Sequence, residues 1–370
     1  PQLTVPAGIT LRKYIYSCPK CIRGKLLILF HDYRTNLFVT FVLEKGRENK
    51  VVFILVHTRL AHSLSFAKEI YRNYMTKEIK TNSLKAWFLA ARPKTLSAAA
   101  VPVLIGSALA YNDAGTYFQW LPCILCLLFA FVMQIDANFI NDLFDFFKGS
   151  DREDRLGPKR ACAQGWITIE AMKRGIAFTT MLACGVGLPL IYYGGLELIG
   201  VGILCVLFAF LYTMKLSYLG WGDLLVLLFF GIVPVGFTYY VQVHSWTWDV
   251  TIAAIACGLV IDTLLMINNY RDREQDAISG KKTIVVRMGA HAGRRGYLLL
   301  GVVASLLCIY YAWTEHYWAA ILPQIYLVPH FLAWNKIIRI QKGKELNSVL
   351  ADTARNIFLF GILLTIGLVL

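Results

Sequence analysis

Residues 119–147 read QWLPCILCLLFAFVMQIDANFINDLFDFF, and this stretch decides the class of the fold. Its length exceeds the roughly 20 residues that a helix needs to cross a bilayer, and its first half is almost wholly apolar. Its second half carries amides and carboxylates at helical spacing, which places them along one stripe of the helix. Because lipid offers such groups no partners, we expect the stripe to face a bundle interior or a wet cavity.

The rest of the chain repeats the apolar pattern. Apolar residues make up 57% of the sequence and charged residues only 16%, which is outside the balance of a soluble globular domain. Long apolar runs separated by short polar breaks predict an all-α polytopic membrane protein. The nine expected transmembrane helices are 96–111, 119–147, 175–193, 197–214, 222–242, 250–270, 296–313, 317–335 and 354–370.

Lysine and arginine are unevenly distributed between the loops. From residue 84 onward, the breaks after the odd-numbered spans contain neither residue, and the breaks after the even-numbered spans contain nearly all of them. Under the positive-inside rule this alternation places the N-terminal side and the even loops in the cytoplasm and supports nine spans. The net charge of +14 is therefore explained mostly by topology, and no nucleic-acid partner is indicated.

Residues 1–74 have a different character. Their apolar runs at 26–30 and 51–56 are followed closely by histidine and charged residues, and both are too short to span a bilayer. The first methionine is Met75, which leads directly into the first span. We expect residues 1–74 to be an N-terminal extension, translated from upstream sequence or poorly ordered, and residues 75–370 to form the membrane domain.

Two clusters of amides and carboxylates lie at the ends of the second and sixth spans. The first contains Gln134, Asn138, Asn141, Asp142, Asp145 and Asp151, and the second contains Asn268, Asn269, Asp272 and Asp276. Hydrogen bonding between helices is an alternative role for amides such as Gln134 and Asn138. Packing does not call for anionic charge, so the carboxylates indicate bound cations.

Magnesium is the cation that such a donor set favours. Mg²⁺ takes one or two carboxylates and completes its shell with phosphate oxygens and water. The two clusters therefore suggest two rims of one magnesium–diphosphate site, with an apolar substrate tail in the membrane. Basic residues near the clusters would neutralise the remaining diphosphate charge, although topology explains most of them. They are Arg160, Lys215, Arg271, Lys281 and Lys282, with Arg160 and Lys281 the stronger candidates.

Both motifs resemble those of the UbiA-type intramembrane prenyltransferases. They are Asn138-x-x-x-Asp142-x-x-Asp145 and Asn268-x-x-x-Asp272-x-x-x-Asp276. Further stretches look most similar to the branch that prenylates 1,4-dihydroxy-2-naphthoate in menaquinone biosynthesis. These stretches are Arg92-Pro93-Lys94-Thr95, Gly157-Pro158 with Arg160 and Gln164-Gly165, Gly222-Asp223, and Gly280-Lys281-Lys282-Thr283. The resemblance covers residues 84–300 and continues through the last three spans mainly by hydropathy.

The resemblance implies nine helices around a central cavity in a bacterial inner membrane, with cytoplasmic loops capping the site. The implied magnesium and catalytic residues are Asn138, Asp142, Asp145, Asp272 and Asp276, supported by Asn141 and Asp151. The implied substrate-binding residues are Gln134, Asn138, Asn141, Arg160, Gln164, Lys215, Asn268, Asn269, Arg271 and Lys281. The implied reaction is magnesium-assisted loss of diphosphate from a polyprenyl diphosphate. The aromatic ring then attacks the allylic cation and loses carbon dioxide, giving demethylmenaquinone.

Two features depart from the family pattern and leave the aromatic acceptor open. They are Ala161-Cys162-Ala163 before Gln164, and the additional acid Asp136 inside the second span. A different acceptor, such as 4-hydroxybenzoate, is therefore an alternative. A transporter is a second alternative, because similar motifs four helices apart resemble internal repeats. Transporter sites normally lie near the membrane midplane, however, and both clusters lie at its boundary.

Overall fold

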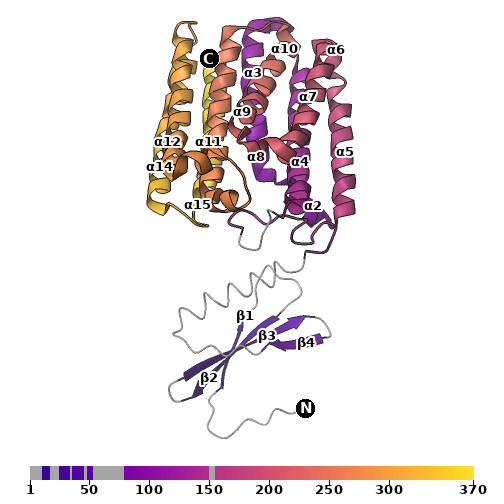
Figure 1. Ribbon diagram of the computed structural model, residues 1–370, viewed down its shortest axis with the longest axis vertical. Helices are drawn as coiled ribbons and strands as arrows, with labels where there is room; N and C mark the ends of the chain where they lie inside the picture. The colour runs from indigo at the N-terminus through magenta and orange to yellow at the C-terminus, as the bar shows by residue number, and fades with distance from the viewer. Residues whose placement is uncertain (1–10, 17–24, 34–35, 46–47, 53–78, 150–154) are drawn as a thin grey trace. The chain divides into compact units, whose positions relative to one another are not determined.

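The computed structural model describes residues 11–16, 25–33, 36–45, 48–52, 79–149 and 155–370, and the chain divides into two units between Ile79 and Lys80. The first unit contains an antiparallel sheet with strand order β1-β2-β3-β4 (Figure 1). Its strands are β1 (Leu11–Tyr16), β2 (Lys25–Tyr33), β3 (Asn36–Lys45) and β4 (Glu48–Val52). The apolar run 26–30 lies in β2. That residues 1–74 are an N-terminal extension, translated from upstream sequence or poorly ordered, stays a prediction.

The second unit is all-helical wherever the structure describes it, which confirms the predicted fold class. Its first half contains α2 (Leu84–Ala91), η1 (Pro93–Thr95), α3 (Leu96–Ala114), η2 (Gly115–Tyr117), α4 (Trp120–Phe147), α5 (Ile169–Gly187), α6 (Leu190–Gly194), α7 (Glu197–Leu211), the π-helical η3 (Tyr212–Leu216) and α8 (Ser217–Leu219). Its second half contains α9 (Gly222–Val226), the π-helical η4 (Leu227–Ile232), α10 (Val233–Val243), α11 (Trp248–Ile278), α12 (Ile284–Leu307), η5 (Cys308–Ala312), α13 (Tyr317–Ile321), η6 (Leu322–Tyr326), α14 (Leu327–Ile340) and α15 (Leu346–Val369).

Within the described residues, 8 helical segments are long and apolar enough to cross a membrane, and they correspond to predicted spans one to seven and nine. The predicted span 317–335 is also helical, because α13, η6 and α14 follow one another without a gap. Pro323, Gln324 and His330 make this segment less apolar than the others. The chain is therefore a multi-pass membrane protein with close to the predicted number of spans.

Several helices extend beyond their predicted bounds at the same end of the unit. Helices α5 and α12 begin earlier than predicted, where Thr168 and Thr283 cap the first turns by accepting hydrogen bonds from Ala171 and Val286. Helix α11 continues past residue 270 to Ile278. Hydropathy missed these turns because they carry charged side chains, which on α11 are those of Arg271, Asp272 and Asp276 of the candidate site.

Helix α11 forms the centre of the packed core, together with residues of α3, α10 and α15. Small residues bring neighbouring backbones close to it: a Cβ added to Gly231 would lie 2.4 Å from the carbonyl oxygen of Ala254. Helices α4 and α11 run in the same direction, so both acid clusters end at the lower end of the helical unit in Figure 1. The chain ends at the other side, where Asn112 donates a hydrogen bond to the carbonyl of Leu368.

Candidate functional site

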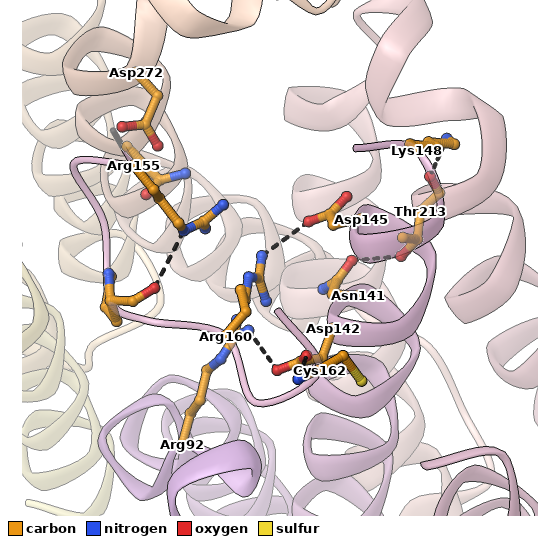
Figure 2. A network of polar contacts seen from close by, with 12 residues as sticks. Arg92, Asn141, Asp142, Asp145, Lys148, Arg155, Arg160, Cys162, Thr213 and Asp272 are labelled. Carbon is orange, nitrogen blue, oxygen red and sulfur yellow. Dashed lines mark hydrogen bonds and ion pairs between the residues drawn. The ribbon is translucent and has the colours of Figure 1, made fainter. Parts of the chain in front are cut away.

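Asp142 of α4 is held by the backbone of a loop. Its two carboxylate oxygens accept hydrogen bonds from the backbone N–H groups of Ala161 and Cys162, each at 2.9 Å (Figure 2). Arg92 Nη2 lies 3.9 Å from the same carboxylate, which is only 1% exposed. The unusual Ala161-Cys162 sequence therefore contributes through its backbone, so its departure from the family pattern leaves this contact intact.

Asp145 lies one turn further along α4 and pairs with the same loop. The guanidinium of Arg160 donates a hydrogen bond to Asp145 Oδ2 at 2.9 Å, and both residues are buried. A charged pair this well shielded from water is strong only when its geometry is good, and breaking one partner is costly. Figure 2 shows Arg160 reaching from the loop towards Asp145.

The amides of α4 hold neighbouring helices. Asn138 Nδ2 donates to Ala91 O and Thr95 Oγ1, each at 3.0 Å, so it fixes the turn between α2 and α3. Asn141 Oδ1 accepts a hydrogen bond from Thr213 of η3. Gln134, two turns before Asp142, is half-buried. Asn138 therefore has the helix-packing role that we considered for these amides.

The cluster on α11 is organised around Arg271, whose side chain is 1% exposed. Its Nε and Nη2 atoms donate to both carboxylate oxygens of Asp272, at 2.7 and 2.5 Å. It also donates to Asn268 Oδ1 at 2.7 Å and to Asn347 Oδ1 of α15 at 2.8 Å. Arg271 therefore positions Asp272 and joins α11 to α15. Asn269, beside it in sequence, is buried.

Asp276 is paired with a lysine that follows α11. Lys281 Nζ lies 3.6 Å from Asp276 Oδ1. Burial alone would lower the pKa of Lys281, but Asp276 and Asp145 outweigh burial and raise that pKa above its ordinary value. Lys281 therefore stays cationic beside carboxylates from both clusters.

The ring of Tyr218 contacts two lysine side chains. Lys148 Nζ lies 3.8 Å from the ring centroid and Lys281 Nζ lies 5.2 Å from it. Lys148 also donates to the carbonyls of Thr213 and Met214 at 2.9 and 2.6 Å. Burial lowers the pKa of Lys148, with Asp145 opposing that shift. Gly220, at φ +87°, allows the close turn after Tyr218: a Cβ there would lie 2.3 Å from Lys282 O.

The two acid clusters meet at one site. Asp145 of α4 interacts electrostatically with Asp276 of α11 and with Lys281. The loop that carries Arg160 also reaches α15, because Asn347 Nδ2 donates to Leu156 O at 2.8 Å. In Figure 2 the Arg155 and Arg160 side chains lie between Asp272 on one side and Asp145 on the other.

Within the described residues, no side-chain contact joins three other predicted site residues to this network. Gln164, Lys215 and Lys282 are exposed, and Asp151 lies outside the described residues. Asp136 accepts hydrogen bonds from Thr179 and Thr180 of α5, at 2.5 and 2.9 Å, so this additional acid packs α4 against α5.

Four residues that contribute to this network were not predicted from the sequence: Lys148, Thr213, Tyr218 and Asn347. The position of Lys148 directly after the first cluster was an available signal. The other three lie on helices remote in sequence, and no local pattern marks them.

The donor set suits a hard divalent cation. The carboxylates of Asp142, Asp145, Asp272 and Asp276 supply only oxygen, which is what Mg²⁺ prefers. Across the described part of the chain, no three acidic, histidine or cysteine side chains are arranged to hold a metal ion by themselves. Magnesium usually completes its shell with substrate phosphates and water rather than with an all-protein cage.

Comparison with known proteins agrees with this geometry. Residues 99–361 match the UbiA prenyltransferase family. The 1,4-dihydroxy-2-naphthoate octaprenyltransferase of Haemophilus influenzae is 37% identical over 310 residues, which cover 80% of this chain and 99% of that protein. The Escherichia coli protein of the same name is 36% identical over 241 residues, covering 63% of this chain and 77% of that protein. A solved UbiA homolog from Archaeoglobus fulgidus bound to GPP and Mg²⁺ has a TM-score of 0.54 at 14% identity, covering 77% of this chain and 99% of that chain. By its sequence match and its fold, this chain belongs to the UbiA prenyltransferase family.

Proposed function

We propose that this chain transfers a polyprenyl group from polyprenyl diphosphate to 1,4-dihydroxy-2-naphthoate, releasing diphosphate and carbon dioxide and giving demethylmenaquinone. The observation that carries the proposal is the convergence of Asp145 and Asp276, with Arg160 and Lys281, at one end of the helical unit. Acids and cations from two helices suit a diphosphate bound with a metal ion. The relatives named for dihydroxynaphthoate support the choice of acceptor.

In the proposed reaction, the bond between the allylic carbon and the diphosphate oxygen breaks. A bond then forms from that carbon to the ring carbon that carries the carboxylate, which leaves as carbon dioxide. Arg160 and Lys281 would hold the negative charge of the departing diphosphate. The apolar helices around the site would keep water away from the allylic cation.

Mg²⁺ is the cation that we propose for this site. When bound, it would neutralise diphosphate charge and make diphosphate a better leaving group. Asp145, Asp272 and Asp276 are the proposed ligands, with Asn138 near them on α4. Asp142 already accepts two backbone N–H groups, so its proposed contribution is to fix the loop that carries Arg160. The A. fulgidus homolog bound to GPP and Mg²⁺ supports use of this metal within the family.

The proposed location is the bacterial inner membrane, with the site facing the cytoplasm. The clustering of lysine and arginine in the loops at the site end supports this orientation. Membership in a prenyltransferase family favours an enzyme over the transporter alternative.

The direct test is an assay of purified protein with dihydroxynaphthoate, a polyprenyl diphosphate and Mg²⁺, with and without a chelator. We expect product only when Mg²⁺ is available, and no product from Asp142→Asn or Asp272→Asn variants that remain folded. Asp352→Asn is the matched control, because Asp352 pairs with Lys336 and Arg355 away from the site. Near-normal product from either site variant would refute the proposed roles.

The same assay identifies the acceptor. The mass of the product formed from a mixture of dihydroxynaphthoate and 4-hydroxybenzoate shows which ring is prenylated. If the main product is a prenylated benzoate, the proposed acceptor is wrong, but the proposed diphosphate site is unaffected.

Residues 1–74 are proposed to be unnecessary for prenyl transfer. The H. influenzae relative supports this, because 99% of its length is matched by 80% of this chain. A chain started at Met75 should insert into membranes and turn over within about twofold of the full chain, as expected when distant parts act independently. Loss of activity on removing residues 1–74 would refute this division.

A further inference from the structure

Two further acids of the helical unit lie outside the ion pairs described above, and each has a carboxyl oxygen without a hydrogen-bond partner among the described residues. Asp262 precedes Asp272 on α11 by about 15 Å, taking 1.5 Å per helical residue. It is 4% exposed, and its Oδ1 atom has no hydrogen-bond partner among the residues that the structure describes. Oδ1 of Asp223, a half-buried residue in the first turn of α9, also has no hydrogen-bond partner among those residues.

Other acids within the helices are satisfied, which makes this pair unusual. Asp136 accepts from Thr179 and Thr180, and the carboxylate of Asp249 accepts from Tyr310. An unsatisfied carboxyl in an apolar interior is costly, so it is retained where a ligand supplies the missing donor.

Asp223 and Asp262 are brought to one place by a close approach of α9 to α11. A Cβ added to Gly222 would lie 3.2 Å from Leu265 Cδ2, and Leu265 lies one turn after Asp262. The same Cβ would lie 3.9 Å from the hydroxyl of Tyr212. Asp223 and Asp262 interact electrostatically with each other.

Tyr212 connects this pair to the diphosphate site. Its hydroxyl interacts electrostatically with Asp223 and Asp262 and also with Asp145 and Asp276. Tyr212 begins the π-helical segment η3, and a second π-helical segment, η4, follows α9. Such π segments are frequent at functional sites, because they turn side chains out of the regular helical register.

We propose that Asp223 and Asp262 bind the hydroxyl groups of the aromatic acceptor, with Tyr212 lying between that ring and the diphosphate. This inference rests on the proposed function and names the part of the site that takes the ring. The prenyl tail has no hydrogen-bond donors to offer these acids.

The arrangement orients the ring as well as binding it. Hydroxyls held by Asp223 and Asp262 would fix the position and the plane of the ring relative to the diphosphate site. Hydrogen bonds from the ring hydroxyls to carboxylates also increase the electron density of the ring, which favours its attack on the allylic carbon.

The first test compares Asp262→Asn, Asp223→Asn and the control Asp136→Asn in purified full-length protein. We expect both site variants to raise the KM for dihydroxynaphthoate about tenfold or more, as loss of a hydrogen bond to a charged group does. The KM for the prenyl diphosphate should stay within about twofold, because the two subsites bind independently. The control, with its buried acid bonded to threonines, should change neither KM.

The second test removes a hydroxyl from the ligand instead. The inhibition constant of 1-hydroxy-2-naphthoate, which lacks one hydroxyl, is compared with that of a non-reacting 1,4-dihydroxy analogue. The wild type should bind the dihydroxy compound more tightly, and this preference should disappear in the variant that faces the missing hydroxyl. A merely structural role would weaken both ligands together and leave the ratio unchanged.

The outcomes separate this inference from the proposed function. If the wild type makes no prenylated dihydroxynaphthoate, the proposed function fails, and this inference fails with it. If the wild type turns over but both variants keep the wild-type acceptor KM and ligand ratio, only the inference is overturned. Equal affinity of the wild type for the two ligands overturns it too, even if neither variant folds.

Discussion

The acids on α4 and the acids on α11 form similar motifs, but they are neutralised in different ways. On α4, Asp142 and Asp145 receive their N–H donors from a loop that lies outside the helix. On α11, Asp272 is neutralised by the adjacent residue, Arg271, and Asp276 by a lysine just beyond the helix end. The α11 half is therefore assembled by local sequence, whereas the α4 half depends on a loop that closes over it.

This difference suggests how the site responds to substrate. Arg160 is engaged by Asp145, and a metal ion bound to Asp145 would compete with it for the carboxylate. Arg160 would then be available to a phosphate oxygen, for which its planar fork is well suited. Arg271 is held by Asp272, Asn268 and Asn347 together, so it is expected to stay in place.

The largest expected effect is on the α4 half. Asp145→Asn removes a proposed magnesium ligand and the carboxylate to which Arg160 donates, so we expect kcat/KM to fall about a thousandfold. The measurement is product formation at saturating Mg²⁺ with the amount of folded protein matched by gel filtration. Asp352→Asn, which also removes an acid paired with an arginine, should stay within about twofold. Retention of more than a tenth of the activity by Asp145→Asn would argue that Asp276 alone carries the metal.

The contrast between the two halves also limits what sequence could predict. The helical stripe of α4 and the acids of α11 followed directly from spacing within each helix, and convergence followed from both clusters ending at one membrane face. The partners of Asp142 could not be predicted, because they are backbone N–H groups whose direction depends on how the loop folds. Asn347, remote in sequence, contacts Arg271 only because α15 packs against α11.

The next largest effect is on stability, and it is tested by comparing substitutions of two arginines. Arg271→Gln leaves Asp272 without its cation and disconnects α11 from α15, so we expect a loss of about 3 kcal/mol in the free energy of unfolding. Arg160→Gln removes a contact between the loop and α4 rather than one between two long helices, and we expect it to raise the KM for prenyl diphosphate more than it lowers stability. Denaturant unfolding and steady-state kinetics on both variants provide the comparison. Equal stability losses would show that the loop is as integral to the fold as α11.

A smaller effect is expected where the loop meets α11. A Cβ at Gly157 would lie 2.8 Å from Arg271 Nη2, so Gly157→Ala must move either the loop or the guanidinium. We expect a loss of about 1 kcal/mol in stability and a few-fold rise in the KM for prenyl diphosphate, since small overpacking costs are typical here. Gly185→Ala is the control, because the space around a Cβ at that position is open. Gly149→Ala is unsuitable, because Gly149 has a positive φ that an alanine would strain. Wild-type stability and a wild-type KM in Gly157→Ala would show that the α11 cluster does not depend on its contact with the loop.

The smallest effect is a pH dependence at Lys148, on the α4 side. Burial lowers its pKa in the folded chain below the ordinary value of 10.5, with Asp145 opposing and Lys281 assisting. Between the lowered pKa and 10.5 the folded chain binds fewer protons than the unfolded chain, so the contribution of Lys148 to stability rises with pH. The free energy of unfolding of the wild type, relative to Lys148→Met, should therefore increase from pH 7 towards pH 10.

Arg355→Gln is the control for this pH dependence, because a guanidinium does not titrate and its difference from the wild type should stay constant over that range. The Lys148 experiment also tests the contrast between the halves of the site. A lysine held by carbonyls and a ring on the α4 side carries a cost at neutral pH, whereas Lys281 beside Asp276 does not. A difference for Lys148→Met that is flat or falls with pH would show that Asp145 neutralises Lys148 as fully as Asp276 neutralises Lys281. The two halves would then be alike in how they hold their cations.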